Sequence, residues 1–317
     1  MNASSGARHR ESLPQLGPEP FLTDGGIETT LIFHDGLDLP FFAAYDLLTR
    51  DGGEDALRRY FEPYLAVARQ RGLGIVLETP TWRASPDWAH RLGHDTRQLA
   101  ELNRRAVALL EELRDLQGPD APPVVISGCV GPRGDGYVVD TAMSAEEAAA
   151  YHAVQVDTFA ATAADLVTAI TMTSADEAVG VVRAAQEAGV PVVISFTVET
   201  DGRLPSGQPL REAVEEVDAR TGSGAAYFMV NCAHPTHFED VLETGSAWTD
   251  RIRGVRANAS RLSHAELDEA EELDEGDPDE LAAQYLALRE RLPALTVLGG
   301  CCGTDHRHIA AIAAAWR

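Results

Sequence analysis

Short apolar runs alternate along this chain with longer segments in which apolar residues recur every three or four positions. An apolar run of about four to eight residues is typical of a buried strand, and the longer spacing is typical of an amphipathic helix. Eight runs predict strands, over residues 20–24, 74–79, 123–129, 165–171, 190–198, 225–232, 252–257 and 295–300.

The segments between these runs carry recognisable helix starts. Asp95 precedes a periodic run that extends to Leu116, and Thr304 precedes one over residues 308–316. Ser144 and Ser174 are each followed three positions later by a glutamate, which is the pattern of a capping box. The chain is therefore predicted to consist of repeated strand–helix units.

Eight such units predict the α/β class, as a single (β/α)8 TIM barrel of parallel strands. No break in composition and no linker divides the 317 residues, so we expect one domain over residues 19–317. Residues 1–18 are mostly polar, and we expect them to form a disordered amino-terminal tail.

The charge of the chain excludes several classes of partner. It has 50 acidic and 26 basic residues, a formal charge of −24, which repels nucleic acid and anionic membranes. No apolar run reaches the roughly 18 residues of a spanning helix, and the amino terminus has no signal-peptide pattern. We expect a soluble cytoplasmic protein without nucleic-acid or membrane partners, and the sequence does not indicate its oligomeric state.

The acidic residues are concentrated in one segment. Ten of the fifteen residues over 266–280 are acidic, and Gly276 and Pro278 interrupt any helix there. A charge run of this kind is typical of a solvated surface, so we expect an exposed loop and helix after the seventh strand.

Three of the four cysteines lie at predicted strand ends. Cys232 ends the sixth run, and Cys301 and Cys302 directly follow the eighth. The carboxyl ends of barrel strands lie at one face, so these thiols can converge, and three sulfurs with one open position suit a catalytic Zn²⁺. The alternative is that Cys232 is a buried apolar residue and the adjacent pair only a turn. Cys129 is expected to be a buried core thiol.

Several motifs then carry a resemblance. They are Thr23-Asp24-Gly25-Gly26, Gly131-Pro132, Asn231-Cys232, Asn258 and Gly299-Gly300-Cys301-Cys302-Gly303-Thr304. Over residues 20 to 317 the chain resembles the homocysteine S-methyltransferase family. The resemblance implies a zinc-dependent barrel enzyme in which Cys232, Cys301 and Cys302 hold the metal.

The implied reaction needs two small-molecule partners, a thiol acceptor and a cationic methyl donor. A thiol bound to a metal loses its proton and can attack a methyl group on a sulfonium or quaternary ammonium. S-methylmethionine, S-adenosylmethionine and betaine are all donors of this kind, and the sequence does not choose among them. Phe41, Phe42, Trp82 and Tyr137 are candidates for an aromatic cage around the cation.

The acceptor site is expected to contain residues from several strand ends. The resemblance assigns the amino acid end of the acceptor to Asp24 and Gly25. The other expected substrate-binding residues are Glu78, Thr79, Thr171, Glu199 and Asn231. Relatives often have a glutamate at the position of Ile170, and Glu199 on the next strand is a candidate for the missing charge. Arg83, where betaine-dependent relatives carry a tyrosine, is a candidate for reading a carboxylate.

Three functions stay open at this point. The default is methylation of homocysteine to methionine, and the alternatives are a different acceptor thiol or a noncatalytic protein that senses zinc or thiols. A zinc hydrolase is less favoured, because three thiolates make the metal a poor Lewis acid. His234 and His237 are expected to lie outside the metal ligands, and His306 and His308 at the surface.

Overall fold

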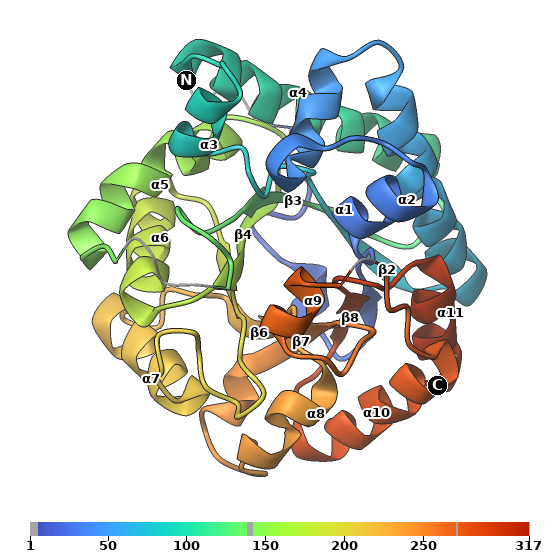
Figure 1. Cartoon of the computed structure of the whole chain (residues 1–317), viewed down its shortest axis with the longest axis vertical. Coiled ribbons are helices and arrows are strands. Elements are labelled where there is room, and N and C mark those ends of the chain that lie inside the picture. Colours follow the sequence, from blue (N-terminus) through green and yellow to red (C-terminus); the bar gives the residue numbers. More distant parts are fainter. Residues whose placement is uncertain (1–5, 138–141, 271, 317) are drawn as a thin grey trace.

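The computed structural model describes residues 6–137, 142–270 and 272–316. Eight parallel strands form a closed barrel in chain order, and the helices surround it (Figure 1). The strands are β1 (Phe21–Leu22), β2 (Gly74–Glu78), β3 (Val124–Val130), β4 (Leu166–Met172), β5 (Val192–Phe196), β6 (Tyr227–Asn231), β7 (Ile252–Ala257) and β8 (Val297–Gly300). Each lies within or overlaps one predicted run, which confirms the (β/α)8 barrel.

Helices follow the strands as the pattern predicted. The α-helices are α1 (Ile27–Thr29), α2 (Gly53–Arg71), α3 (Pro86–Arg91), α4 (Thr96–Leu116), α5 (Ala145–Ala160), α6 (Ala175–Ala188), α7 (Leu210–Thr221), α8 (Pro235–Phe238), α9 (His264–Asp268), α10 (Pro278–Arg291) and α11 (His306–Ala315). Short 3-10 or π turns cover Pro14–Leu16, Thr30–His34, Pro40–Phe42, Ala44–Thr49, Glu239–Val241 and Thr249–Arg251.

Two of the predicted helix starts differ in detail. Asp95 and Ser144 form complete capping boxes, whereas Ser174 forms only half of one. The Glu177 carboxylate instead accepts from the Arg133 amide at 2.8 Å and lies 2.9 Å from His152 Nε2. The last helix begins after Asp305 and not after Thr304, whose hydroxyl donates to the Cys301 carbonyl at 2.7 Å.

The barrel interior has an apolar floor and a polar upper layer. The floor is a cluster of buried residues, Leu13, Phe21, Val76, Val125, Leu166, Val193, Tyr227, Met229 and Val297. Side chains of a strand alternate between its two faces, so positions two residues further along point inward above this floor. These positions are polar on most strands and include Thr23, Glu78, Ser127, Thr168, Ser195 and Asn231. Polar side chains therefore line the interior of the barrel at its carboxyl face.

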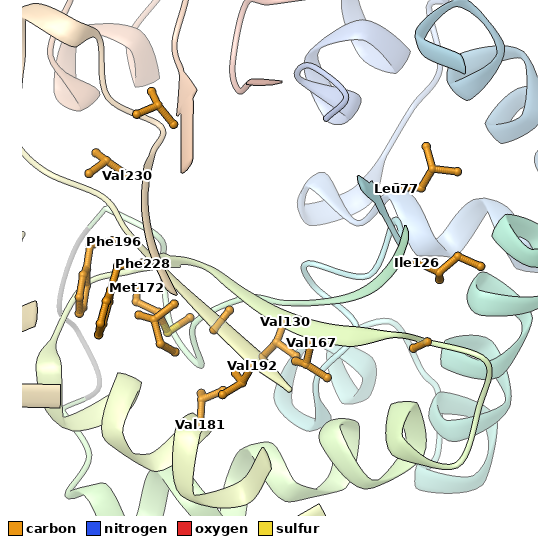
Figure 2. Packing of buried hydrophobic residues seen from close by; sticks show 14 of the residues in the cluster. Leu77, Ile126, Val130, Val167, Met172, Val181, Val192, Phe196, Phe228 and Val230 are labelled. Carbon is orange, nitrogen blue, oxygen red and sulfur yellow. The ribbon is translucent and has the colours of Figure 1, made fainter. Parts of the chain in front are cut away.

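The main core lies between the outer faces of the strands and the helices. Figure 2 shows part of it, where Val181 of α6 lies near Val192 of β5. The rings of Phe196 and Phe228 stack with centroids 6.2 Å apart at 9°. Each fully buried side chain of this size contributes about 1.5 to 3 kcal/mol, so this layer fixes the strands on which the site is built.

Residues 6–17 pack against the amino-terminal end of the barrel. The amides of Arg8 and His9 donate to Asp165 at 2.7 and 2.8 Å, and Arg10 donates to three carbonyls at the end of α5 and in the segment before β4. Residues 6–17 therefore do not form the disordered tail that was expected over residues 1–18. Their backbone amides supply hydrogen-bond partners to the buried Asp165 carboxylate. Residues 1–5 lie outside the described part of the chain.

The acidic segment lies at the opposite end of the barrel. Its acidic side chains are mostly exposed, as predicted, and α9 lies in front of the strand ring (Figure 1). The segment is also anchored, since Ser260 donates to Asp274 at 2.6 Å and the Glu275 carbonyl bonds the His308 ring at 2.8 Å. Among the described residues, no helix has the length and apolar character required to cross a membrane.

Candidate metal and substrate site

Three cysteine sulfurs meet at the carboxyl face of the barrel. Cys232 Sγ lies 2.9 Å from Cys301 Sγ and 3.5 Å from Cys302 Sγ. All four cysteines are free thiols, and Cys129 is buried apart from this cluster. The prediction that strands β6 and β8 bring three thiols together is confirmed.

Local backbone geometry lets both strand ends present their sulfurs. Cys232 has a φ of 55°, a left-handed conformation that turns its side chain away from the strand direction. Gly303 has a φ of 77°, and Thr304 donates to the Cys301 carbonyl through its amide at 3.1 Å. This tight turn after β8 allows two consecutive residues to contribute to one cluster, which an extended strand would not allow.

The donor set fits a zinc ion. Thiolates bind Zn²⁺ at about 2.3 Å, so in a tetrahedral site neighbouring sulfurs lie about 3.8 Å apart. The measured separations of 2.9 and 3.5 Å are therefore within about 1 Å of that geometry. Cys232, Cys301 and Cys302 would hold the ion, and three sulfur ligands leave one position for a substrate.

The three thiols are electrostatically unequal. Hydrogen bonds with Cys232 and Cys302, helped by the guanidinium of Arg256, hold the pKa of Cys301 well below its usual value. The pKa of Cys232 is raised by its hydrogen bonds with the same two sulfurs and by burial. A second thiolate in this buried cluster needs a positive charge beside it, which a metal cation supplies.

The cysteines open onto one cavity at the barrel mouth. Predicted substrate residues Asp24, Gly25, Glu78, Thr79 and Thr171 line it. The other lining residues are Gly26, Ile27, Glu28, Thr29, Pro80, Trp82, Cys129, Tyr137, Ile170, Arg256 and the three cluster cysteines. Two of the four proposed cage aromatics, Trp82 and Tyr137, thus line the cavity, and the Tyr137 hydroxyl lies 3.1 Å from Cys232 Sγ.

Asp24 is held by a buried ion pair. Its Oδ1 accepts from Arg256 Nη2 at 2.7 Å, and its Oδ2 accepts from the Tyr60 hydroxyl at 2.9 Å. Arg256 Nε also donates at 3.1 Å to the carbonyl of Gly300, the residue that precedes Cys301. The sequence analysis missed Arg256, although an arginine facing inward near the end of the β7 run was a usable signal. Gly26, whose amide donates to the Thr304 carbonyl at 2.9 Å, has no free donor for a substrate.

Two further carboxyl groups face the cavity. Burial raises the pKa of Glu78 to about 7 and that of Glu28 to about 8. Glu78 is 5 % exposed, and its Oε2 has no partner among the described residues. Both groups would ionise readily if a cation entered the cavity, because the cation would offset the cost of burying their charge.

Asn231 organises the strand ends beneath the sulfurs. Its Oδ1 accepts from the Ser195 hydroxyl at 2.6 Å and from the Thr171 amide at 2.9 Å. Asn231 Nδ2 donates to Thr171 Oγ1 at 2.8 Å and lies 3.9 Å from Cys301 Sγ. Its side chain is fully buried, so its visible role is to position Thr171.

Four other candidate residues lie elsewhere. Glu199 is outside the cavity lining, because its carboxylate pairs with His264 Nδ1 at 3.2 Å. Phe41 and Phe42 are about half exposed on the loop after β1. Arg83 lies over the ring of Trp82 at 3.9 Å and donates to the Gly134 carbonyl at 2.9 Å, so stacking fixes it beside the cavity wall.

The histidines follow the prediction with one correction. His234 caps α8 and His237 bonds the Arg261 carbonyl at 2.9 Å, and neither joins the sulfur cluster. His308 was expected at the surface but is fully buried, because its ring bonds Asp305 and the Glu275 carbonyl. His264 of α9 is an addition to the site, since its Nε2 lies 2.5 Å from the Cys232 carbonyl.

Comparison with known proteins identifies the family. A model of homocysteine S-methyltransferases matches residues 21–316. The chain belongs to the homocysteine S-methyltransferase family. It is accordingly a thiol methyltransferase, as the sequence predicted.

Solved structures agree with this assignment at the level of the fold. The metallated form of homocysteine methyltransferase MmuM from Escherichia coli has a TM-score of 0.72 at 21% identity, covering 93% of this chain and 96% of that chain. The oxidized form of MmuM has a TM-score of 0.74 at 22% identity, covering 97% of this chain and 99% of that chain. A search of curated protein sequences finds no significant match to the present chain.

Proposed function

We propose that this protein is a zinc-dependent methyltransferase that moves a methyl group from a sulfonium or quaternary ammonium donor to a thiol, with homocysteine as acceptor and methionine as product. The observation that carries the proposal is the meeting of Cys232, Cys301 and Cys302 at one cavity that is also lined by aromatic residues and carboxyl groups. When bound, Zn²⁺ supplies the acidity that makes a thiol nucleophilic at neutral pH.

The bonding changes in this reaction need no further acid or base. The acceptor sulfur forms a bond to the methyl carbon as the donor's bond to that carbon breaks, and the bonding pair stays with the donor. The donor leaves as a neutral thioether or tertiary amine. The acceptor proton is released to solvent before transfer. The protein has to hold the two reactants in line, since positioning lowers the barrier of a reaction between two bound molecules.

The cavity offers a place for the cationic end of the donor. The residues that line it together with the three cysteines include Trp82, Tyr137 and Glu28. A cation over an aromatic face gains about 0.5 to 2 kcal/mol, more when water is excluded. The pKa of Glu28 is raised to about 8, and an approaching sulfonium or ammonium would stabilise its ionised form.

A reconstitution experiment tests the proposal. The zinc-loaded protein is incubated with homocysteine and each of S-methylmethionine, S-adenosylmethionine and betaine, and methionine is followed by mass spectrometry while bound zinc is measured by elemental analysis. We expect one zinc per chain and methionine from at least one donor. Cys301→Ser should lose both, whereas Cys129→Ser, a thiol outside the cluster, should retain the zinc. Bound zinc without any methylated thiol would support the noncatalytic alternative.

A further inference from the structure

Two residues that line the cavity, Arg256 and Glu78, each have a buried polar atom without a partner, and the two atoms have opposite charge character. Arg256 Nη1 is a buried cationic donor without a hydrogen-bond partner in the described chain, and Glu78 Oε2 is a buried acceptor in the same condition. Both residues are 5 % exposed, and both line the cavity that contains the cysteines. A buried polar atom without a hydrogen-bond partner is unfavourable, so a ligand that supplied a partner to each of these two atoms would gain affinity.

We propose that Arg256 and Glu78 bind the α-amino acid head of the acceptor thiol, Arg256 its carboxylate and Glu78 its ammonium. This inference rests on the proposed function and names the residues that read the acceptor. It places the ammonium at β2 and not at β4, where Ile170 presents an apolar wall to the cavity.

The surroundings of Arg256 leave one edge of its guanidinium for a ligand. Nη2 donates to Asp24 at 2.7 Å and to the Gly25 carbonyl at 3.3 Å, and Nε donates to the Gly300 carbonyl at 3.1 Å. These contacts fix the plane of the side chain and leave Nη1 as the donor still to be satisfied. The bond to Gly300 also fixes this group next to Cys301, so a carboxylate held there belongs to a molecule whose sulfur can reach the cluster.

Glu78 is suited to an ammonium and not to a neutral group. It is the last residue of β2 and faces inward above the apolar floor, near the hydroxyls of Ser127 and Thr168. With a pKa raised to about 7, its carboxyl takes up a proton easily, and an entering ammonium would displace that proton. Asp24 already has Arg256 and Tyr60 as partners, so Glu78 is the carboxylate with an unpaired acceptor atom among the described residues.

Three thiols that differ only in the head group test the assignment. Calorimetric titration of the zinc-loaded protein with homocysteine, 4-mercaptobutyrate, which lacks the amino group, and 3-aminopropanethiol, which lacks the carboxylate, gives the Kd values. Glu78→Gln should weaken homocysteine and 3-aminopropanethiol by about 10- to 100-fold and leave 4-mercaptobutyrate within about twofold. Arg256→Lys should weaken homocysteine and 4-mercaptobutyrate by about tenfold and leave 3-aminopropanethiol unchanged.

A matched carboxylate controls for a general loss of charge. Glu199→Gln removes the mouth carboxylate that pairs with His264 and should not discriminate between thiols with and without the amino group. If Glu199→Gln does discriminate, or if Glu78→Gln weakens all three thiols equally or none of them, the proposal is overturned. If Arg256→Lys does not fold, the wild-type values decide, because equal binding of homocysteine and the two truncated thiols also overturns it.

The two proposals fail in different ways. Absence of any methylated thiol from the wild-type protein contradicts the proposed function. Normal methylation of homocysteine together with a Glu78→Gln variant that binds all three thiols like the wild type contradicts only the assignment of the head-group site.

Discussion

The Asn231 side chain holds Thr171 in a left-handed backbone conformation. Asn231 bonds both the amide and the hydroxyl of Thr171, at 2.9 and 2.8 Å, and Thr171 has a φ of 64°. A β-branched residue rarely adopts this conformation, which costs about 1 to 3 kcal/mol. The register of β4 shifts at this point, between Ala169 and Met172, and Thr171 faces the cavity. Asn231, the last residue of β6 and the residue before Cys232, thus holds the strained Thr171 in place.

Removing this support should destabilise the fold. Asn231→Ala leaves the Thr171 amide and hydroxyl without partners, so we expect the free energy of unfolding to fall by about 2 to 3 kcal/mol in urea titrations. Thr171→Gly removes both the hydroxyl and the strain, so Asn231→Ala should cost less in that background. Additive effects of the two substitutions would contradict the coupling.

The stability of the folded protein should depend on the charge of Glu78. Folding raises its pKa from 4.5 to about 7, chiefly through burial, with Asp24 adding to the shift and Arg256, Ser127 and Thr168 opposing it. The folded state therefore holds the proton more tightly, and this contribution is complete below about pH 4.5 and lost as the pH rises through 7. Glu78→Gln should be more stable than wild type by up to about 3 kcal/mol at pH 8 to 9, with the difference vanishing near pH 4.

Thermal melts of both proteins over this pH range check the prediction. They are run without substrate, because a bound ammonium would stabilise the ionised form. Asp305 titrates in the acid range in both proteins and cancels in the comparison. A constant difference between the two melting temperatures at all pH values would contradict a titrating Glu78.

Trp82 should matter for the methyl donor and Phe42 should not. Trp82 lines the cavity that contains the cysteines, whereas Phe42 is 50% exposed and outside the lining. Trp82→Ala should raise the KM for the donor about tenfold through loss of the cation–π contact, with a smaller change in the KM for the thiol. Phe42→Ala should change both by less than about twofold. Steady-state kinetics with donor and acceptor varied separately distinguish these outcomes.

A carboxylate placed on β4 should rescue the loss of Glu78. Ile170 lines the same cavity, so Ile170→Glu in the Glu78→Gln protein supplies an anion from another strand. We expect homocysteine affinity to recover by about five- to tenfold relative to Glu78→Gln alone, measured by calorimetry. The affinity for 4-mercaptobutyrate should not recover, since it has no ammonium. Recovery for both thiols would mean that the introduced carboxylate acts on the fold and not on the amino group.

The local order of the chain could be read from the sequence. The apolar runs match all eight strands, and the caps at Asp95 and Ser144 match helix starts, because strand alternation and capping depend on residues a few positions apart. The glycines around Cys301 and Cys302 likewise indicated a turn that could present two thiols together.

Contacts across the barrel were decided only by the tertiary structure. Arg256 and Asp24 are 232 positions apart and form an ion pair, Glu199 turns to His264 instead of the cavity, and the tail at Arg8 binds Asp165. Which inward-facing groups meet depends on the stagger of the strands and on the paths of the loops, and neither leaves a short-range pattern in the sequence. The sequence by itself therefore determined the barrel and its candidate zinc cysteines. Which charged groups lie around these cysteines was decided only by the way the closed barrel brings distant strands together.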